Sequence, residues 1–396
     1  MFRKGAAFMV YLDNAATTKV KDSVLLAMTP YFTDVFGNAS STYTTVGQAA
    51  RKALTDARLT VAKAINADEK EIFFTSGGSE ADNWAIKGVA LKNKGNHIIT
   101  TTVEHHAVLH TCEFMEKQGY KVTYVPVDEY GMVSVSDIEK AITDETILVS
   151  VMFANNEIGT INPIAEIGKL CREKGIYFHT DAVQATGAVR IDVKEMNIDL
   201  LSMSSHKFHG PKGVGALYIR KGVKIENLIH GGAQESGRRA TTENVAGIVG
   251  MAKALSEACD NMEEKTKKIT ALRDRLIDGI LETVPYTRLN GHREKRLPNN
   301  TNFCFKYIEG ESLLLSLDMQ GFVVSSGSAC TSGSLDPSHV LLGIGLPHEI
   351  AHGSMRASLS EFTTEEEIDS FIKTLAPIVQ RLRDMSPLYE GVEGKE

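Results

Sequence analysis

The 396-residue sequence lacks several features that would place it in a common class of protein. It has no surplus of positive charge: the formal net charge is −7, so nothing in the composition favours binding to nucleic acid or to an anionic membrane surface. The longest apolar run, residues 147–154, is far shorter than the ~20 residues that a membrane-spanning helix needs. The five cysteines form an odd set with no CxxC spacing, which predicts a reducing, cytoplasmic location rather than a disulfide framework.

Several catalytic signatures are missing as well. No GxGxxG fingerprint of a dinucleotide site is present. Residues 232–237 have the glycine spacing of a P-loop, but Arg238 and Arg239 follow where that loop has Lys and Ser or Thr, which argues against ATP. His106 and His110 have the spacing of metal ligands on a helix, but neither HExxH nor a third ligand accompanies them, so no metal site is predicted.

The N-terminal stretch does not have the pattern of a signal peptide. Its apolar part stops at Asp13, and no cleavage-like site follows. We interpret residues 1–8 as an extension that precedes an alternative start at Met9. No internal repeat with a period of about 20–50 residues is visible, which argues against a solenoid or a propeller.

What the sequence does contain is an alternation of short apolar runs with amphipathic segments of about ten to fifteen residues, which predicts crossover units and a mostly parallel sheet. Strands are expected at residues 71–75, 97–103, 121–127, 146–153, 177–180, 200–203, 216–219 and 301–307. Helices are expected at residues 47–64, 79–91, 105–117, 163–173 and 311–319.

A change in composition divides the chain. Residues 252–281 have a charged helical composition, which predicts a linking helix into a second unit. We therefore expect a large domain at residues 19–255 and a smaller α+β domain built from residues 1–18 and 256–396.

Polar residues follow several predicted strands at the point where each strand ends. In an open α/β sheet the ligand lies beyond the carboxyl ends of the strands, so these residues are expected to meet at one edge. The segments are residues 76–80, 104–106, 154–157, 181–184 and 204–207. Together they predict a functional site at that edge.

Lys207 is the most informative residue at this edge. It stands at the mouth of a predicted strand, after Ser204 and Ser205 and before a glycine-rich turn. Small neighbours suit an amine that must be approached closely, and such a lysine can form a Schiff base with a cofactor aldehyde. Taken by itself, the same pattern also fits a solvent-exposed lysine in a turn.

Other residues at the edge suit the same chemistry, each with a simpler structural alternative. Residues 77–79 could cradle a phosphate on a helix N-terminus, or Ser79 could merely cap that helix. Asp181 ends a strand in an apolar setting and could pair with a pyridinium nitrogen or cap the next helix. His105 could stack on an aromatic ring or shuttle protons.

Two residues further along complete the candidates. Cys330 lies in residues 325–334, a Ser/Gly-rich segment without bulky side chains that can bury little apolar surface and is expected to be weakly ordered. It is either a nucleophile on a mobile loop or an incidental cysteine. Arg356 could clamp a substrate carboxylate or form a surface salt bridge. The remaining cysteines are expected to be packing residues: Cys112, Cys171, Cys259 and Cys304.

With these motifs assembled, the sequence resembles the cysteine desulfurases of the NifS/IscS type. The resemblance runs from about residue 11 to about residue 389 and rests on YLDNAATT, FTSGGSEADN, EHHAVL, NNEIG, DAVQ, SHKFHGPKG, SSGSACTSGSLDPSHVL and HGSMR, in that order. It implies a pyridoxal 5′-phosphate (PLP) enzyme of fold type I, aspartate-aminotransferase-like, acting as a homodimer. It also implies L-cysteine as substrate, a sulfur-acceptor or cluster-scaffold protein as partner, and a role in iron–sulfur cluster assembly or other sulfur delivery.

The resemblance assigns roles residue by residue. Lys207 is implied to be the Schiff-base lysine, His105 to stack on the cofactor ring, and Cys330 to accept the sulfur as a persulfide, with transient cluster ligation as a further implication. The implied cofactor-binding residues are Gly78, Ser79, His105, Asn156, Asp181, Gln184, Ser204, His206, Lys207 and, from the neighbouring subunit, Thr242. The implied substrate-binding residues are Asn38, Asn156 and Arg356.

The chain departs from the family pattern in an early loop and in the phosphate cradle. Ala39 stands where proline is usual, Tyr43 where histidine is common, and Gly78 and Ser79 replace an Ala-Thr pair while keeping the hydroxyl. Three alternative functions fit parts of the sequence. The first is a selenocysteine lyase or the desulfurase branch with an RxGxxC-type segment. The second is a PLP transaminase, and the third is an inactive binding subunit of a sulfur-transfer complex. The Ser/Gly-rich segment argues against the RxGxxC branch, and a transaminase would not need Cys330.

Overall fold

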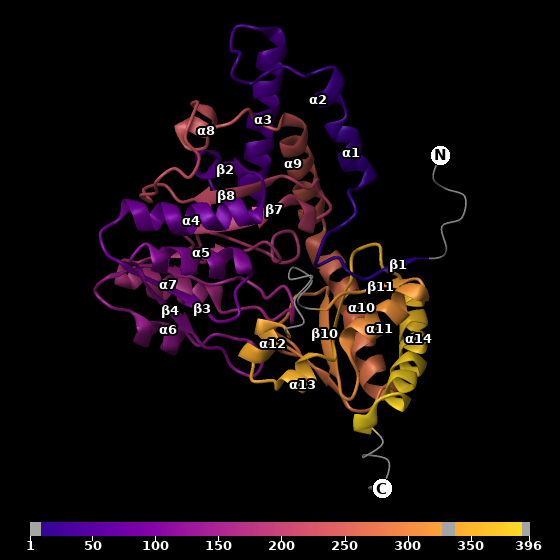
Figure 1. The fold of residues 1–396 in the computed structure, drawn as a ribbon. Helices are drawn as coiled ribbons and strands as arrows, with labels where there is room; N and C mark the ends of the chain where they lie inside the picture. The colour runs from indigo at the N-terminus through magenta and orange to yellow at the C-terminus, as the bar shows by residue number, and fades with distance from the viewer. Residues whose placement is uncertain (1–8, 327–336, 390–396) are drawn as a thin grey trace.

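A seven-stranded sheet forms the centre of the molecule (Figure 1). The computed structural model describes residues 9–326 and 337–389, so the expectations for residues 1–8 and for Cys330 lie outside the described residues. The strand order is β2-β8-β7-β6-β5-β3-β4; the neighbours from β7 to β4 pair in parallel, and β8 is antiparallel to both of its neighbours. The predicted mostly parallel sheet is therefore confirmed. The strands are β2 (Ile72–Thr75), β3 (His97–Thr101), β4 (Lys121–Val125), β5 (Thr146–Ser150), β6 (Tyr177–Asp181), β7 (Leu200–Ser204) and β8 (Gly215–Ile219).

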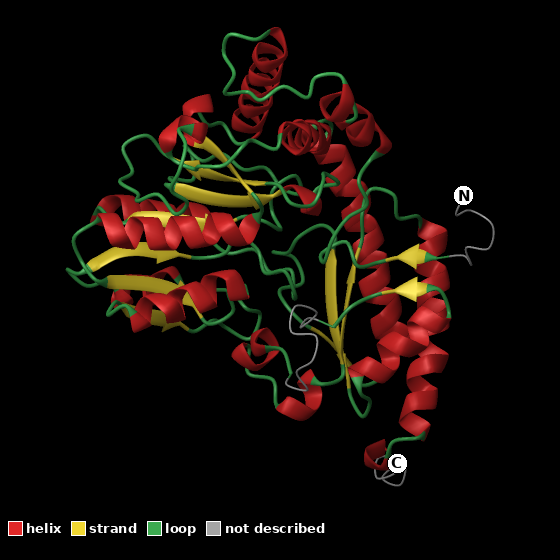
Figure 2. Cartoon of the chain, turned by 45° about the horizontal axis from the view of Figure 1, so that its top comes forward, coloured by secondary structure: helices red, strands yellow, loops and turns green. Residues whose placement is uncertain are grey.

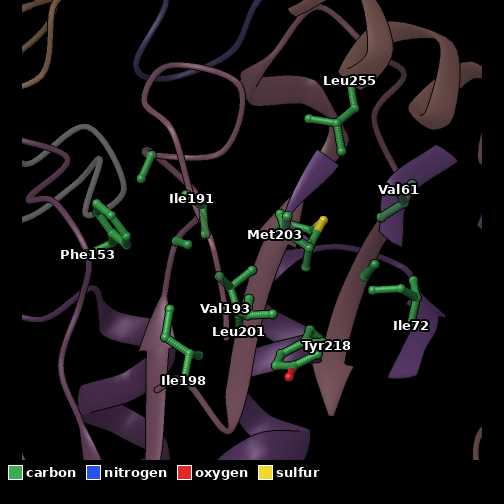
Figure 3. Packing of buried hydrophobic residues seen from close by; sticks show 14 of the residues in the cluster. Val61, Ile72, Phe153, Ile191, Val193, Ile198, Leu201, Met203, Tyr218 and Leu255 are labelled. Atoms are coloured by element: carbon green, nitrogen blue, oxygen red, sulfur yellow. The ribbon is translucent and has the colours of Figure 1, made fainter. Parts of the chain in front are cut away.

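Helices cover both faces of this sheet (Figure 2). Successive side chains of a strand point to opposite faces, and so Leu200 packs on one face while Leu201 packs on the other. Figure 3 shows part of the core on the Leu201 face of the main sheet. Leu201, Met203 and Tyr218 belong to the same hydrophobic cluster there as Val61 and Leu255. The first face is covered by α4 (Gly78–Lys92) and α5 (His106–Lys117), and the second by α3 (Thr45–Ala64), α7 (Ile164–Lys174) and α9 (Val245–Cys259).

A separate, smaller core lies beside the main sheet, in the orange and yellow part of Figure 1. Its antiparallel sheet has the order β12-β10-β9. Val10 and Leu12 are wholly buried in this core, because the N-terminal strand β1 pairs in parallel with β11. The elements are β1 (Val10–Tyr11), β9 (Thr287–Leu289), β10 (Asn300–Phe305), β11 (Phe322–Val323), β12 (Ser354–Ser358), α10 (Met262–Thr283), α11 (Gly310–Met319) and α14 (Glu365–Asp384). The proposed domain boundaries remain a prediction.

Short elements complete the described part of the chain. They are α1 (Asp22–Met28), α2 (Pro30–Thr33), η1 (Glu69–Glu71), α6 (Val135–Ala141), η2 (Ser205–Lys207), α8 (Gln234–Gly237), α12 (His339–Gly343) and α13 (His348–Ala351). None of the helices in the described ranges combines the length and the apolar character needed to cross a membrane.

The prediction of one linking helix at residues 252–281 is wrong. The structure has two helices there, because α9 ends at Cys259 and α10 begins at Met262. Asn261 between them has φ of 53°, a left-handed conformation that interrupts a right-handed helix. The charged composition continues across this break, so the composition by itself gave no sign of it.

Strands β3 and β5 end earlier than predicted, at Thr101 and Ser150. Side chains then take over the backbone partners that a longer strand would have used. The Met152 amide donates to Glu104 Oε1 at 2.9 Å, and the Met152 carbonyl accepts from Asn162 Nδ2 at 2.9 Å. The edge of the sheet is therefore lined by side chains from the point where these strands stop.

Stability of the smaller core can be tested on one helix. Leu317 of α11 is wholly buried, whereas Leu315 on the same helix is 68% exposed. Leu317→Ala is expected to lower the free energy of unfolding by about 2–5 kcal/mol, because it leaves a cavity. Leu315→Ala should change it by less than about 0.5 kcal/mol. Urea unfolding followed by circular dichroism measures both, and equal effects would contradict the assigned core.

Candidate active site

A cavity of about 280 Å³ opens at the carboxyl edge of the main sheet. Residues that follow β2, β3, β5, β6 and β7 line it, as the order of the strands predicts. It brings together most of the predicted site residues: Gly78, Ser79, His105, Asn156, Asp181, Gln184, Ser204, His206, Lys207 and Arg356. The carboxyl edge of the main sheet thus gathers site residues from the range 78–207, and Arg356 joins them from the smaller sheet.

Lys207 enters the cavity from η2, the single turn that follows β7. Its Nζ donates to the carbonyl oxygens of Ala15 at 2.6 Å and of Ala16 at 3.0 Å. Gln184 Nε2 also donates to the Ala15 carbonyl, at 3.0 Å, and His206 Nδ1 lies 3.1 Å from Thr17 Oγ1. The turn at residues 15–17 is therefore held by side chains from two strand ends, and it fixes the position of the amine.

Asp181 is the last residue of β6 and is only 6% exposed. Its Oδ1 accepts a hydrogen bond from the Val183 amide at 2.9 Å. Burial raises the pKa of this carboxyl to about 6, and the Val183 amide and the Lys207 ammonium act in the opposite direction. A cation placed beside Asp181 would remove much of the cost of burying its charge.

The turn between β2 and α4 forms a close-fitting cradle. α4 begins at Gly78, and its N-cap residue, Gly77, has no side chain that could accept from the amides of the first turn. These amides and the helix dipole therefore favour an anion. A Cβ on Gly78 would lie 2.6 Å from Val183 Cγ2. A Cβ on Gly215 would lie 2.7 Å from Gly77 Cα. Larger residues would force β2, β6 and β8 apart at this point.

Arg356 reaches the cavity from β12 of the smaller sheet, and only 3% of its surface is exposed. Its Nη1 donates to the Asn156 carbonyl at 3.0 Å, and its Nη2 donates to Asp13 Oδ1 at 2.9 Å. Its Nε is buried without a hydrogen-bond partner in the described part of the chain. A buried donor of this kind is costly unless a ligand accepts from it.

Two predicted site residues in the described ranges, Asn38 and Thr242, do not line this cavity. Asn38 is exposed, and its Oδ1 accepts from the Ser40 amide at 2.9 Å. Thr242 is also exposed and lines a different cavity of about 200 Å³, together with Ser76. Cys330 lies outside the described residues, but Ser325, just before that stretch, exchanges two backbone hydrogen bonds with Arg356, at 2.6 and 3.1 Å.

Comparisons with known proteins agree on one family. The class-V aminotransferase model matches residues 10–371. Cysteine desulfurase IscS of Clostridium botulinum is 65% identical over 385 residues, covering 96% of this chain and 97% of that protein. A NifS-like protein of known structure is 40% identical, with a TM-score of 0.89 over 95% of this chain and 100% of its own. A structure described as SspA in complex with cysteine is 37% identical, with a TM-score of 0.78 over 89% and 99% of the two chains.

The chain belongs to the class-V aminotransferases, among the NifS/IscS-like cysteine desulfurases. Its fold is PLP fold type I, and the enzyme is PLP-dependent. The cavity suits that cofactor, since it offers an amine at Lys207, a buried carboxylate at Asp181 and, within the described residues, a helix N-terminus at Gly78 without a side-chain cap.

His105 of this desulfurase is held as a neutral ring. It is the N-cap residue of α5, and its Nδ1 accepts from the Ala107 amide at 3.1 Å. Burial, and then the charge of Lys207, lower the pKa of His105 to about 4. A neutral ring can lie flat against an aromatic cofactor without adding a charge to the site.

Two buried carboxyls next to Asp181 were given no role from the sequence, although Glu104 belongs to the polar segment at residues 104–106. Asp82 is 1% exposed and lines the same cavity; its Oδ1 has no hydrogen-bond partner in the described ranges and lies 3.6 Å from His179 Nε2. Glu104 is wholly buried and accepts from Thr101 Oγ1 at 2.8 Å. The available signal was spacing: Asp82 is one helical turn beyond Gly78, on the same face of α4.

The electrostatics of this group leave Asp181 as the anion. Burial, and then the charge of Asp181, raise the pKa of Asp82 well above its ordinary value. Burial raises the pKa of Glu104 to about 8 and lowers the pKa of His179 to about 3, so His179 stays neutral between the hydroxyls of Ser150 and Ser202. Glu104, with a pKa of about 8, therefore keeps its proton at a pH at which Asp181, with a pKa of about 6, has lost its own, and the charge of Asp181 favours the protonated form of Asp82.

This arrangement predicts how Asp82→Asn changes stability with pH. Because the pKa of Asp82 is raised in the folded state above its ordinary 3.8, the folded chain binds its proton more tightly than the unfolded chain does. That contribution is fully present below the ordinary pKa and is lost as pH rises toward the folded pKa. The variant lacks this titration, so its stability relative to the original should rise over that window, by up to about 1.4 kcal/mol per pH unit.

Urea unfolding at about pH 4, 6 and 8 measures the difference between the two proteins. A stability difference that does not change with pH would mean that Asp82 has an ordinary pKa in the folded protein.

Proposed function

We propose that this desulfurase converts L-cysteine to L-alanine and keeps the sulfur as a persulfide on Cys330, for iron–sulfur cluster assembly or another sulfur-delivery route. The observation that supports this most is the convergence of Lys207, Asp181 and Arg356 on one cavity in a chain 65% identical to a named cysteine desulfurase. The cysteine present in the SspA structure supports the same substrate class.

The residues around the cavity are proposed to hold PLP in one orientation. Asp181 would pair with the pyridine nitrogen, His105 would lie against the ring, and the cradle at Gly78 would take the phosphate. When bound, the cofactor supplies an electron sink for charge that develops on the substrate carbon. The other proposed cofactor contacts are Ser79, Asn156, Gln184, Ser204 and His206.

Lys207 is proposed to hold the cofactor covalently in the resting enzyme and then to move a proton. As a free amine, its Nζ would take the proton from the substrate Cα and later return a proton to the product. The carbonyls of Ala15 and Ala16 lie 2.6 and 3.0 Å from Nζ and stabilise the protonated amine by accepting from it. They also keep the amine in the cavity between the two transfers.

Arg356 is proposed to bind the substrate carboxylate. Asp13 and the Asn156 carbonyl fix the plane of the guanidinium, and the unpartnered Nε is the donor that a carboxylate can accept from. Asn38 remains a proposed contributor, although it does not line the cavity of its own chain.

Cys330 is proposed to take the sulfur. Its thiolate attacks the substrate sulfur and forms an S–S bond; the bond from sulfur to Cβ breaks, Cβ gains a proton, and alanine leaves. The four cysteines in the described ranges are poorly suited to this role, because burial raises the pKa of each thiol, to about 12 for Cys171 and about 11 for Cys304. The backbone pairing of Ser325 with Arg356 starts the segment that contains Cys330 at the edge of the cavity.

The enzyme is proposed to be a cytoplasmic homodimer that passes sulfur to an acceptor or scaffold protein. Support for a dimer comes from large apolar side chains left exposed on α1, on α2 and around the start of α3, at the top of Figure 1. Thr242, proposed to reach the phosphate in the neighbouring subunit, is likewise exposed. The apolar residues are Leu25, Leu26, Phe32, Phe36, Tyr43 and Val46.

The sulfur step separates a desulfurase from a transaminase. With L-cysteine and a reductant, the enzyme should release alanine and sulfide in equal amounts, measured by amino-acid analysis and a colorimetric sulfide assay. Cys330→Ala should still bind L-cysteine, because Lys207 and Arg356 remain, but should release no sulfide. Cys259 is half-buried and does not line the cavity, so Cys259→Ala is the matched control and should release sulfide at the full rate. Sulfide release from Cys330→Ala at the original rate would exclude the mechanism.

The carboxylate clamp makes a separate prediction. Arg356→Lys should raise KM for L-cysteine by about tenfold to a hundredfold, since a lysine cannot keep Asp13 and Asn156 and also serve the substrate; a charge-assisted hydrogen bond contributes about 1.5–3 kcal/mol. Steady-state kinetics measures KM, and kcat should fall less than KM rises. An unchanged KM would place the substrate carboxylate elsewhere.

A further inference from the structure

The short element α8 and the chain that follows it toward α9 contain an unusual concentration of backbone strain. Glu235, Ser236 and Thr241 have φ of 48°, 58° and 127°, in the left-handed range that favours glycine. Such residues cost about 1–3 kcal/mol each and persist where their surroundings over-determine them, commonly at ligand clamps. We call residues 234–242 the strained segment, and it ends at Thr242, the residue proposed above to complete the partner's site.

One ion pair anchors the start of the strained segment to the main sheet. Arg58 of α3 donates to both oxygens of Glu235, each at 2.7 Å, and the Glu235 side chain is 3% exposed. Glu235 Oε2 also accepts from the Phe74 amide of β2 at 2.9 Å, and Arg58 donates to the Ile72 carbonyl at 2.6 Å. Such a bidentate and nearly buried pair is strong enough to hold a left-handed residue in place.

A second ion pair joins the end of the segment to the phosphate cradle. Arg239 donates to both oxygens of Glu80, at 2.8 and 2.9 Å, with 16% and 12% of the two side chains exposed. Glu80 lies in the first turn of α4, and its Oε2 also accepts from the Ser76 amide at 2.8 Å. One carboxylate therefore contacts both the cradle of its own subunit and the segment that presents Thr242.

We propose that Arg239 is a positioning residue for PLP binding: through Glu80 it holds the strained segment so that Thr242 meets the cofactor phosphate of the neighbouring subunit. This inference rests on the proposed role of Thr242. Ser76, Arg239, Thr241 and Thr242 line the same cavity of about 200 Å³. Loss of the Arg239 side chain would therefore leave the strained segment free to relax into this cavity. Thr242 would then shift without any change in its own chemistry.

The test measures the dissociation constant of PLP by its absorbance in the reconstituted enzyme. Arg239→Gln should raise this constant by about tenfold, the effect of losing one charge-assisted hydrogen bond. Arg238→Gln removes the same charge from the adjacent residue, whose guanidinium lies over the Phe73 ring, and should leave the constant unchanged. Arg239→Lys, which keeps the charge, should recover part of the affinity and serves as the second variant if Arg239→Gln does not fold.

A double-variant cycle shows whether Arg239 acts through Thr242. Thr242→Val should also weaken PLP binding, and adding it to Arg239→Gln should cause no further loss. An unchanged dissociation constant of PLP in Arg239→Gln would overturn the positioning role while leaving the role of Thr242 intact. So would losses of PLP affinity that multiply in the double variant. An unchanged dissociation constant in Thr242→Val would instead contradict the proposed cross-subunit contact, and the positioning role of Arg239 with it.

Discussion

Burying Asp181 is the constraint to which the site is adapted. A carboxylate that is 6% exposed needs either a proton or a cation, and the chain provides Lys207 at the same edge but directs its amine at two carbonyl groups. The charge of Asp181 adds to burial in raising the pKa of Asp82 and of Glu104, so a second negative charge beside it is costly. The pocket is therefore prepared for a ligand that brings a positive charge to Asp181, and the pyridinium of PLP is proposed to be that charge.

The same edge depends on the N-terminal turn. Residues 13–18 leave the smaller core, cross the mouth of the cavity and bind Lys207, Gln184 and His206 on the way. The turn is also tied to β12, where Asn14 Nδ2 donates to the Ser358 carbonyl at 2.9 Å and the Ala15 amide donates to Ser358 Oγ at 2.8 Å. Because Arg356 lies on the same strand, the amine and the guanidinium are positioned by one connected set of hydrogen bonds.

This connection explains why two separate cores form a single site. The main core supplies the strand ends that line the cavity, whereas the turn at residues 13–18 and Arg356 come from the side of the smaller core. The Arg356–Asp13 pair is nearly buried and joins groups 343 positions apart in the chain. Breaking such a pair leaves an uncompensated charge, and so the two cores are held in register at the point where substrate would bind.

Local pattern was sufficient for much of the architecture and for the residues at the strand ends. Alternating strand and helix segments predicted the parallel sheet, and the rule that ligands lie at the carboxyl edge placed Asp181 and Lys207 together, because both follow from short-range periodicity. Arg356 and Cys330 were candidates from their side-chain chemistry and sequence setting, each with a simpler alternative, and the family motifs indicated which alternative to prefer. The break at Asn261 and the early ends of β3 and β5 were missed, since each depends on a backbone conformation or a side-chain partner that composition does not reveal.

The sequence by itself determined which residue types stand at the edge of the sheet, and the tertiary structure decided what each of them contacts. The carbonyl partners of Lys207, the Asp13–Arg356 pair and the proximity of Asp82 to Asp181 all join segments that no periodicity relates. The same holds for Glu80, which touches a segment about 160 positions away. Chemistry of this kind arises from packing, because pKa values and hydrogen-bond partners depend on burial and on neighbours brought together by the fold.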